Sequence, residues 1–331
     1  MVIFFYILLF LLCCAGFYVA GEWIMSGLMR VARFLGWREF VVAFFIMASA
    51  ATLPNLFVGI SSALRGFPQL SFGDVAGNNL AALTLSAAIA AMFCKKNIPA
   101  KSKTIQMTAV IAFAAVLLPL LLTLDGNLSR IDGAVLILTF LLYVIWLFSK
   151  QERFTKVYKG TKSVSEFKKF VFDIVKLVAG ILLLIIAAQG IVVSANQFAA
   201  SLGLSLILIG VLITGPGSAL PEIYFDVQSA KKNEPWMILG DSMGAVILPA
   251  TLVLGVVSLI SPIYIIDFSS FAIARIFLVI SAIAFLYFVK TKQAFTKKEA
   301  FFMIGLYVLF LITEIFLKGY IERSWFNFLM H

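Results

Sequence analysis

The sequence has little of what soluble enzymes use for chemistry. Its single histidine is the last residue, His331, which argues against a histidine-based catalytic or metal site. The three cysteines, Cys13, Cys14 and Cys94, are odd in number and scattered, so they form neither a disulfide framework nor a zinc-ligand pattern. No phosphate-binding loop, Ser/His/Asp set or dinucleotide fingerprint occurs. These absences argue against an enzyme, against ATP hydrolysis and against a resident cofactor.

Charge is also scarce, and apolar residues take its place. Charged residues make up 13% of the 331 residues and hydrophobic residues 62%, with a mean hydropathy of +1.06. This is the composition of a polytopic membrane protein whose main partner is the lipid bilayer. The formal net charge of +10 does not indicate a nucleic-acid partner, because basic residues of membrane proteins collect in cytoplasmic loops.

Ten apolar runs have about the length that a membrane-crossing helix requires. The first lacks a preceding basic residue and a cleavage site, so we expect a retained helix rather than a signal peptide. The second and seventh runs each contain a central proline, which predicts a bend or break there. The predicted fold is an all-α polytopic membrane protein with ten transmembrane helices. The runs lie at roughly 2–20, 40–62, 70–93, 105–124, 132–149, 171–197, 203–229, 236–260, 269–289 and 299–317.

An internal repeat relates the two halves of the chain. A shift of 167 residues superimposes Leu53-Pro54 on Leu220-Pro221 and Gly73-Asp74 on Gly240-Asp241 without a gap. Matched proline, glycine and aspartate are not expected by chance, so the pattern predicts two five-helix repeats. Duplicated, interrupted helices in matching places point to the binding site of a transporter. The predicted parts are a first repeat at 1–149 with its site segment at 48–85, a basic cytoplasmic linker at 150–170, and a second repeat at 171–331 with its site segment at 214–252.

The loop charges predict the orientation. Every loop that follows an odd-numbered run is basic, so the positive-inside rule puts these loops, including the central one, in the cytoplasm and both termini outside a plasma (inner) membrane. The turn near Gly66 then faces outside and its counterpart near Asn233-Glu234 faces inside. Five crossings per half make the halves inverted, with the site segments meeting near the midplane. The central loop is either an ordinary linker or a lipid-contacting segment.

Two pairs of motifs resemble a known family. The first half reads AATLPN at 50–55 and GDVAGNN at 73–79, and the second reads GSALPE at 217–222 and GDSMGAV at 240–246. They resemble the calcium/cation antiporter superfamily, the sodium/calcium exchangers and their proton- and potassium-linked relatives. The family signature is close to G-[ST]-S-L-P-E followed by G-[ND]-x-x-G-S-N. The resemblance implies ten helices in two inverted fives and transport driven by an ion gradient.

The resemblance also implies the ligands of the transported cation. Glu222 would bind the ion, Ser218 and Thr52 would be neutral ligands, and the carbonyls just before each Leu-Pro would complete the shell. The chemistry is consistent with this, because Ca²⁺ prefers six to eight oxygen ligands that include carboxylates. Hydroxyl oxygens would in addition suit Na⁺.

The chain departs from the family pattern at several positions. The first-repeat glutamate is replaced by Asn55, which is either a cation ligand or a partner of the helix break. The Ser-Asn pair is Asn78-Asn79 in the first repeat and Ala245-Val246 in the second. We expect Asn78 to be a further ligand and Asn79 to lie behind the ligands or on the access path. One glutamate instead of two leaves the usual stoichiometry open.

Asp226 is a candidate replacement for the missing carboxylate. It follows Glu222 by four residues, so both project from one face of a continuous helix and could both be metal ligands. Two carboxylates so close would repel, which favours protonation of one and suits proton coupling. The alternative is that Asp226 lies a turn nearer the cytoplasm and pairs with Lys231 or Lys232.

Asp74 and Asp241 occupy equivalent places in the two repeats. Either they lie behind the ligands or on the access path, or they accept backbone N–H groups as helix caps where a glycine breaks the helix. Acids at bilayer depth cost at least ~2.5 kcal/mol each, so a chain that keeps several is expected to use them.

These observations predict a secondary antiporter that exports Ca²⁺ or another divalent cation in exchange for Na⁺ or H⁺ by alternating access. The first and sixth runs, which lack strong charge, would slide across the site-bearing core. Two alternatives remain open. The lost carboxylate has changed the substrate to a different or monovalent cation, or the chain is a channel-like or non-transporting protein with a degenerate site.

Overall fold

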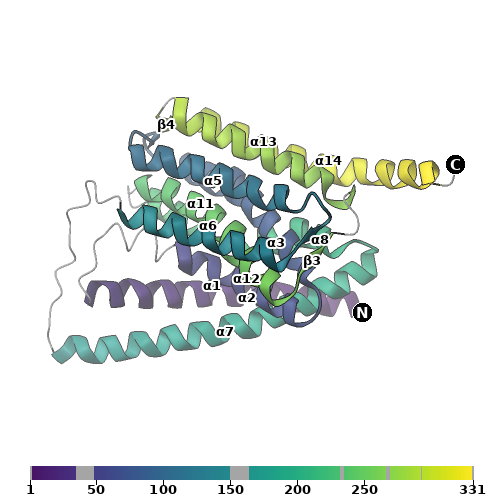
Figure 1. Ribbon diagram of the computed structural model, residues 1–331. Coiled ribbons are helices and arrows are strands. Elements are labelled where there is room, and N and C mark those ends of the chain that lie inside the picture. Colours follow the sequence, from purple (N-terminus) through teal and green to yellow (C-terminus); the bar gives the residue numbers. More distant parts are fainter. Residues whose placement is uncertain are drawn as a thin grey trace.

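The computed structural model describes residues 2–34, 48–149, 164–231, 235–265, 269–291 and 293–329 (Figure 1). The α-helices are α1 (Val2–Phe34), α2 (Ala48–Leu64), α3 (Pro68–Ala81), α4 (Ala87–Phe93), α5 (Lys103–Leu122), α6 (Arg130–Ser149), α7 (Val164–Leu202), α8 (Leu206–Ile209), α9 (Gly215–Ser218), α10 (Leu220–Lys231), α11 (Pro235–Leu248), α12 (Leu254–Ile260), α13 (Ser269–Thr291) and α14 (Lys297–Leu329). Wide π-helical turns are η2 (Ala82–Ser86), η3 (Gly210–Thr214) and η4 (Pro249–Val253). The short strands are β1 (Ile98–Pro99), β2 (Asn127–Leu128), β3 (Ile263–Tyr264) and β4 (Ala294–Phe295).

Eight helical segments in the described residues are long and apolar enough to cross a membrane. They confirm an all-α polytopic fold, and α1 confirms that the first run is helical. Residues 52–64 of α2 form a shorter apolar helix and α14 covers the tenth run, so the total of ten crossings stays a prediction. The eight segments are Ile3–Ile24, Pro68–Phe93, Lys103–Leu122, Arg130–Leu147, Ile174–Leu202, Leu206–Lys231, Met237–Ile260 and Phe271–Thr291.

The two proline-containing runs behave differently. The seventh is interrupted as predicted, because the helix changes to a π turn at η3 and restarts at Leu220, just before Pro221. The second is not split at its proline, since α2 continues through Pro54. A proline removes one backbone N–H, and a helix can continue when the neighbouring hydrogen bonds remain. Residues 40–47 of this run lie outside the described residues.

The helices repeat with the same shift as the sequence. Adding 167 carries α3, η2 and α4 onto α11, η4 and α12 residue for residue, and it carries α2 onto residues 215–231. The starts of α6 and α14 also correspond, and each has a reciprocal cap. Asp132 accepts from the backbone N–H of Ser129 at 2.8 Å, and Glu299 accepts from the backbone N–H of Thr296 at 2.7 Å.

Two small antiparallel sheets show that the repeats are inverted. β1 pairs with β4 and β2 pairs with β3, so each sheet joins one half of the chain to the other. β3 follows α12 as β1 follows α4, yet β4, which holds β1, lies at one end of the bundle and β3 at the opposite end (Figure 1). Equivalent loops therefore face opposite sides. The start of α1 and the end of α14 lie at the same end of the bundle, as an even total of crossings requires (Figure 1).

The described residues include parts of the predicted linker and one of the two predicted turns. Residues 164–170 of the predicted linker are helical and belong to α7, and residues 150–163 lie outside the described residues, so the linker boundaries stay a prediction. The predicted turn at Gly66 is present, with a left-handed φ of 80° that favours glycine. Its counterpart at Asn233-Glu234 lies outside the described residues, as does Lys232.

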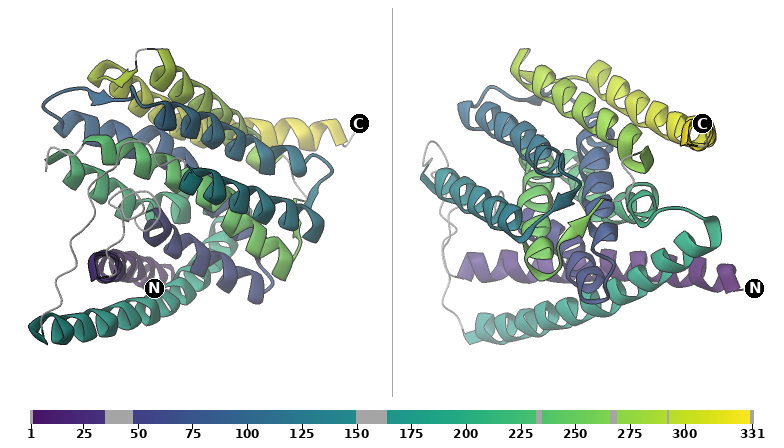
Figure 2. Two further views of the ribbon diagram at one scale, coloured as in Figure 1. Left: turned by 60° about the vertical axis from the view of Figure 1, so that its left-hand side comes forward. Right: turned by 45° about the vertical axis from the view of Figure 1, so that its right-hand side comes forward.

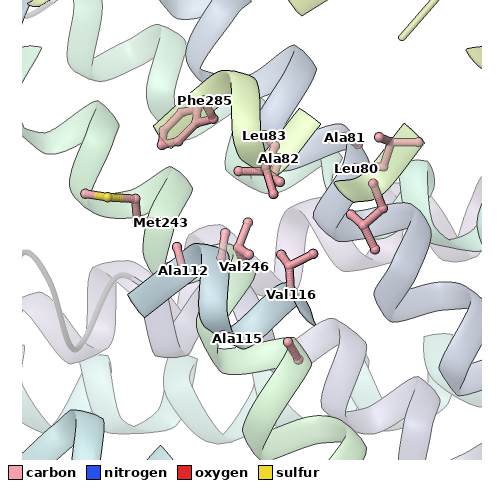
Figure 3. Close-up of a cluster of buried hydrophobic side chains, with 14 of the residues drawn as sticks. Leu80, Ala81, Ala82, Leu83, Ala112, Ala115, Val116, Met243, Val246 and Phe285 are labelled. Atoms are coloured by element: carbon pink, nitrogen blue, oxygen red, sulfur yellow. The ribbon is translucent and has the colours of Figure 1, made fainter. Parts of the chain in front are cut away.

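The apolar interior divides into two clusters. The larger one combines both halves, and Figure 3 shows side chains of η2, α5, α11 and α13 meeting in it, among them Leu83, Val116, Met243 and Phe285. The smaller cluster joins α1 to α7, which run side by side along one flank of the bundle in both views of Figure 2. The first and sixth predicted runs thus form a pair with a core largely of its own.

Glycines bring α3 close to the interrupted helix. A Cβ on Gly77 would lie 2.5 Å from the carbonyl oxygen of Val211, and one on Gly215 would lie 2.6 Å from the backbone nitrogen of Asn78. Only glycine permits such backbone-to-backbone contact, a common device between membrane helices. The contact places the middle of α3 directly against the segment that precedes Glu222.

Candidate functional site

The nine residues selected from the sequence are all buried, each at most 2% exposed. They lie on five helices from both halves, which the inverted repeat brings together. They are Thr52 and Asn55 on α2, Asp74, Asn78 and Asn79 on α3, Ser218 at the end of α9, Glu222 and Asp226 on α10, and Asp241 on α11.

Glu222 lies in the first turn of α10, immediately after the helix interruption. It is 0% exposed, and neither carboxyl oxygen has a hydrogen-bond partner among the described residues. The Asn78 side chain lies beside it, and the carboxyls of Asp241, Asp226 and Asp74 are close enough to act on its charge. A buried carboxyl with unpaired oxygens among other acids is costly unless a cation or proton neutralises it.

Asn78 marks the place where the two halves meet. Its Nδ2 donates to the carbonyl oxygen of Ala245 at 3.2 Å, and these residues are 167 apart, so each is the counterpart of the other. The Oδ1 atoms of Asn78 and Asn79, and both polar side-chain atoms of Asn55, have no partner within the described part of the chain. Such unpaired buried oxygens are suited to bind a cation.

The predicted ligands do not all touch one another. Glu222 and Asn78 lie together, whereas no hydrogen bond joins Asn55 to Glu222 in the described residues. α2 packs on α11, as α10 packs on α11 and on η2. The repeat thus places Asn55 and Glu222 on either side of the crossing between α3 and α11, with Thr52 one turn before Asn55.

Asp74 and Asp241 are not helix caps. Each is the seventh residue of an uninterrupted helix, α3 or α11, so the glycine before it does not break the helix and the cap interpretation is wrong. Ser218 Oγ lies 3.4 Å from Asp74 Oδ1 and donates to the Gly215 carbonyl at 2.9 Å. Asp241 has two buried oxygens without a partner among the described residues.

Asp226 does not pair with Lys231. Its Oδ2 accepts hydrogen bonds from Ser86 Oγ and Ser242 Oγ, both at 2.8 Å, and the side chain is 0% exposed. Lys231 is exposed, with its Nζ 5.3 Å from the centre of the Phe93 ring. The lysine alternative was wrong for Lys231 because serines of η2 and α11 hold Asp226 inside the bundle, before α10 reaches its basic end.

The sequence did not indicate two polar residues of the site, and one predicted carbonyl ligand is hydrogen-bonded within its helix. Ser86 ends η2 and Ser242 follows Asp241 directly; a hydroxyl in each long apolar run was the available signal. The carbonyl just before Leu220-Pro221, expected to be free, is that of Ala219, and it accepts from the backbone N–H of Ile223 at 3.0 Å. The helix resumes at once after the interruption. The Ala219 oxygen keeps a second lone pair, so its role as a cation ligand stays a prediction.

The donor set suits a hard cation held by mixed oxygens. No three Asp, Glu, Cys or His side chains in the described ranges converge tightly enough to hold a metal ion by themselves. An ion bound at Glu222 would therefore need amide, hydroxyl and carbonyl oxygens in addition to a carboxylate. Such mixed shells are common for Ca²⁺.

A family model described as "Sodium/calcium exchanger protein" matches residues 5–149 and 172–316, which covers both repeats. This chain belongs to the sodium/calcium exchanger protein family. Among its relatives in that family, the sodium/calcium exchanger MaX1 of Methanosarcina acetivorans is 23% identical over 358 aligned positions, with 89% of this chain and 95% of the relative covered. The resemblance read from the two motif pairs is thereby confirmed.

Other similar proteins agree with the exchanger fold. An uncharacterized membrane protein of Methanocaldococcus jannaschii is 29% identical over 245 residues, which is 71% of this chain and 76% of that protein. A solved structure of the sodium-calcium exchanger NCX_Mj, soaked with 10 mM Na⁺ and 10 mM Sr²⁺, has a TM-score of 0.67 at 24% identity and covers 94% of this chain and 98% of its own. The present chain, as a member of this family, is an integral membrane protein. The orientation of its loops and termini stays a prediction.

Proposed function

We propose that this protein is a secondary antiporter that exports Ca²⁺, or another divalent cation, in exchange for Na⁺ or H⁺. The observation that carries the proposal is Glu222, a fully buried carboxyl with no hydrogen-bond partner for either oxygen in the described residues, next to a helix interruption. A group of this kind is stable when a cation or proton occupies it. Exchange between the two states is the chemistry of an antiporter.

The ligands are assigned from the polar atoms around the crossing of α3 and α11. Glu222 supplies the charged oxygen, and Asn78 and Ser218 supply neutral oxygens on the same side of the crossing. Asn55 and Thr52 are proposed to approach from the other side when an ion is bound. The buried Asp74, Asp241 and Asn79 surround this set and lower the electrostatic cost of bringing in a cation.

The division of the core supports alternating access as the proposed mechanism. The smaller apolar cluster is formed mainly by α1 and α7, together with Val58, Leu70 and Ile209 of the other helices. The α1–α7 pair is proposed to move over these residues without unpacking the larger cluster. Gly21 of α1 faces Pro221, with its Cβ position 3.8 Å from the proline side chain. Sliding of α1 past this point would expose Glu222 first to one side of the membrane and then to the other. The proposed orientation has both termini outside.

Flux measurements test the proposal. Purified protein in proteoliposomes is given ⁴⁵Ca²⁺ outside and Na⁺, K⁺ or a pH step inside. We expect uptake that requires a counter-ion gradient and that falls at least about tenfold in Glu222→Gln, because a charged oxygen dominates the affinity for a hard cation. Asp125→Asn, which removes an exposed loop carboxylate that contacts Asn127, is the matched control and should transport normally.

The same assay separates the alternatives. Uptake without any counter-ion indicates a channel, and no uptake of any cation indicates a non-transporting protein. The presence of Asn55 in place of a second glutamate favours one rival, an antiporter for a monovalent cation. Counter-ion-dependent ²²Na⁺ or ⁸⁶Rb⁺ exchange that ignores Ca²⁺ would support this rival.

A further inference from the structure

Asp226 has an environment of its own, different from that of Glu222. Two serine hydroxyls donate to its Oδ2. One is Ser86, the last residue of η2 in the first half, and the other is Ser242 of α11. Its Oδ1 has no partner among the described residues. A carboxylate that already holds two donors on one oxygen is fixed in orientation, so the free oxygen points to a defined place.

A second buried carboxyl lies near Asp226. Asp241 directly precedes Ser242, the residue of α11 that donates to Asp226, and α10 packs on α11, so the charge of Asp241 acts on Asp226. Asp241 is 2% exposed, and neither of its oxygens has a hydrogen-bond partner within the described part of the chain. Two adjacent buried carboxyls with three unpaired oxygens repel each other unless a positive charge lies between them.

The inverted repeat supplies an internal comparison for this cluster. The counterpart of Asp226 is Gly59, and the counterpart of Ser86 is Val253. A Cβ on Gly59 would lie 2.7 Å from Cγ2 of Val257 and 3.1 Å from Cγ1 of Val253, with Ser71 Oγ at 2.8 Å. In the first half, valine methyl groups therefore fill most of the space that a carboxyl group takes in the second.

Two further residues around the Asp226 cluster also differ from their counterparts in the other half. Ala90 is the counterpart of Val257, and Val75 is the counterpart of Ser242, and both are buried. The same backbone arrangement therefore occurs twice. In one copy a glycine packs with valines, and in the other Asp226 packs with two serines and an alanine. Because the apolar version packs the same backbone, the polar version is not required by the fold.

We propose that Asp226, Asp241, Ser86 and Ser242 form a second cation site, separate from Glu222, that takes a monovalent cation, Na⁺. Three carboxylate oxygens and the lone pairs of two hydroxyls are available to it. The hydroxyl hydrogens point to Asp226 Oδ2, so their oxygens remain free to bind an ion. Asp241 also acts on Glu222, and a singly charged ion here repels a divalent ion at Glu222 half as strongly as a second divalent ion would.

The inference rests on the proposed function in one respect, the role of Na⁺ as the counter-ion; the existence of the site does not depend on it. Binding is tested without transport, with the full chain in detergent and with ²²Na⁺ and ⁴⁵Ca²⁺ as separate probes. The main variant copies the first half, Asp226→Gly with Ser86→Val and Ala90→Val, so that the lost volume is refilled as the fold itself refills it. Asp226→Asn is the second variant, and Ser258→Ala, which copies Ala91, is the control.

We expect both Asp226 variants to weaken ²²Na⁺ binding at least tenfold and to change ⁴⁵Ca²⁺ binding by less than about fivefold, since the sites interact only through charge. Glu222→Gln should weaken ⁴⁵Ca²⁺ binding at least about tenfold and change ²²Na⁺ binding by less than about fivefold. Ser258→Ala should leave the binding of both ions unchanged. Melting temperature and gel-filtration profile establish that each variant is folded. If the triple variant fails to fold, Asp226→Asn alone decides the outcome.

Three results overturn the inference. Equal loss of both ions in the Asp226 variants means a single site, unchanged ²²Na⁺ binding means no site, and absent ²²Na⁺ binding in the wild type means that the cluster holds a proton instead. Failure of the proposed function has a different signature. In that case the wild type shows no counter-ion-dependent Ca²⁺ flux, while ²²Na⁺ binding still depends on Asp226.

Discussion

Replacing Gly77 by alanine should separate two helices that carry the site. Gly77 is on α3, next to Asn78, and faces Val211 of η3. The added Cβ would lie 2.5 Å from the Val211 carbonyl oxygen and 2.8 Å from its Cα, whereas ordinary contacts begin at 3.4 Å. The helices would have to move apart by about 0.9 Å (3.4 − 2.5). Backbone atoms are involved on both sides, so no change of rotamer relieves the clash.

The size of the effect follows from this geometry. Overpacking a close interface costs about 1–3 kcal/mol, and the rigid backbone contact places Gly77→Ala near ~3 kcal/mol. A loss of that size lowers the melting temperature by about 6 °C or more. A shift of about 0.9 Å also exceeds the ~0.2 Å tolerance of metal–ligand distances, so Ca²⁺ binding through Asn78 should weaken as well.

The assay is thermal unfolding in detergent together with ⁴⁵Ca²⁺ binding. The control is Gly305→Ala on α14, where a Cβ meets nothing within 4 Å. That change should leave the melting temperature unchanged or raise it, because alanine favours a helix by about 1 kcal/mol over glycine. If Gly77→Ala melts within about 2 °C of wild type, the close approach of α3 and η3 is not a feature of the folded protein.

Three further predictions concern the site, the caps and the orientation. Asn55→Glu restores the missing carboxylate and should tighten ⁴⁵Ca²⁺ binding at least about tenfold, or ~1.4 kcal/mol; weaker binding would show that Asn55 is not near the ion. Ser129→Ala and Thr296→Ala remove equivalent caps and should each cost about 1 kcal/mol in thermal unfolding, whereas a large difference between them would contradict their structural equivalence. In a background without native cysteines, a cysteine at Lys101 should react with impermeant maleimide only from the cytoplasm and one at Asn127 only from outside, and the opposite result would reverse the predicted topology.

The sequence by itself determined the class of fold and its symmetry. Apolar runs of helix length, and prolines, glycines and aspartates matched at a spacing of 167, are local signals that survive without any contact being known. They were sufficient to select Glu222 and its neighbours, because an acid in an apolar run is informative wherever it folds. The family motifs around Leu53-Pro54 and Leu220-Pro221 are equally local.

The tertiary structure decided which of these residues meet. Ser86 and Asp226 are 140 residues apart, and no pattern along the chain indicated that a hydrogen bond joins their side chains. Asp74 and Asp241 looked like caps because a glycine precedes each, but α3 and α11 both continue through that glycine. A sequence records the period of each helix, whereas the partner of a buried side chain depends on how distant helices pack, and that became visible only when the two halves were placed together.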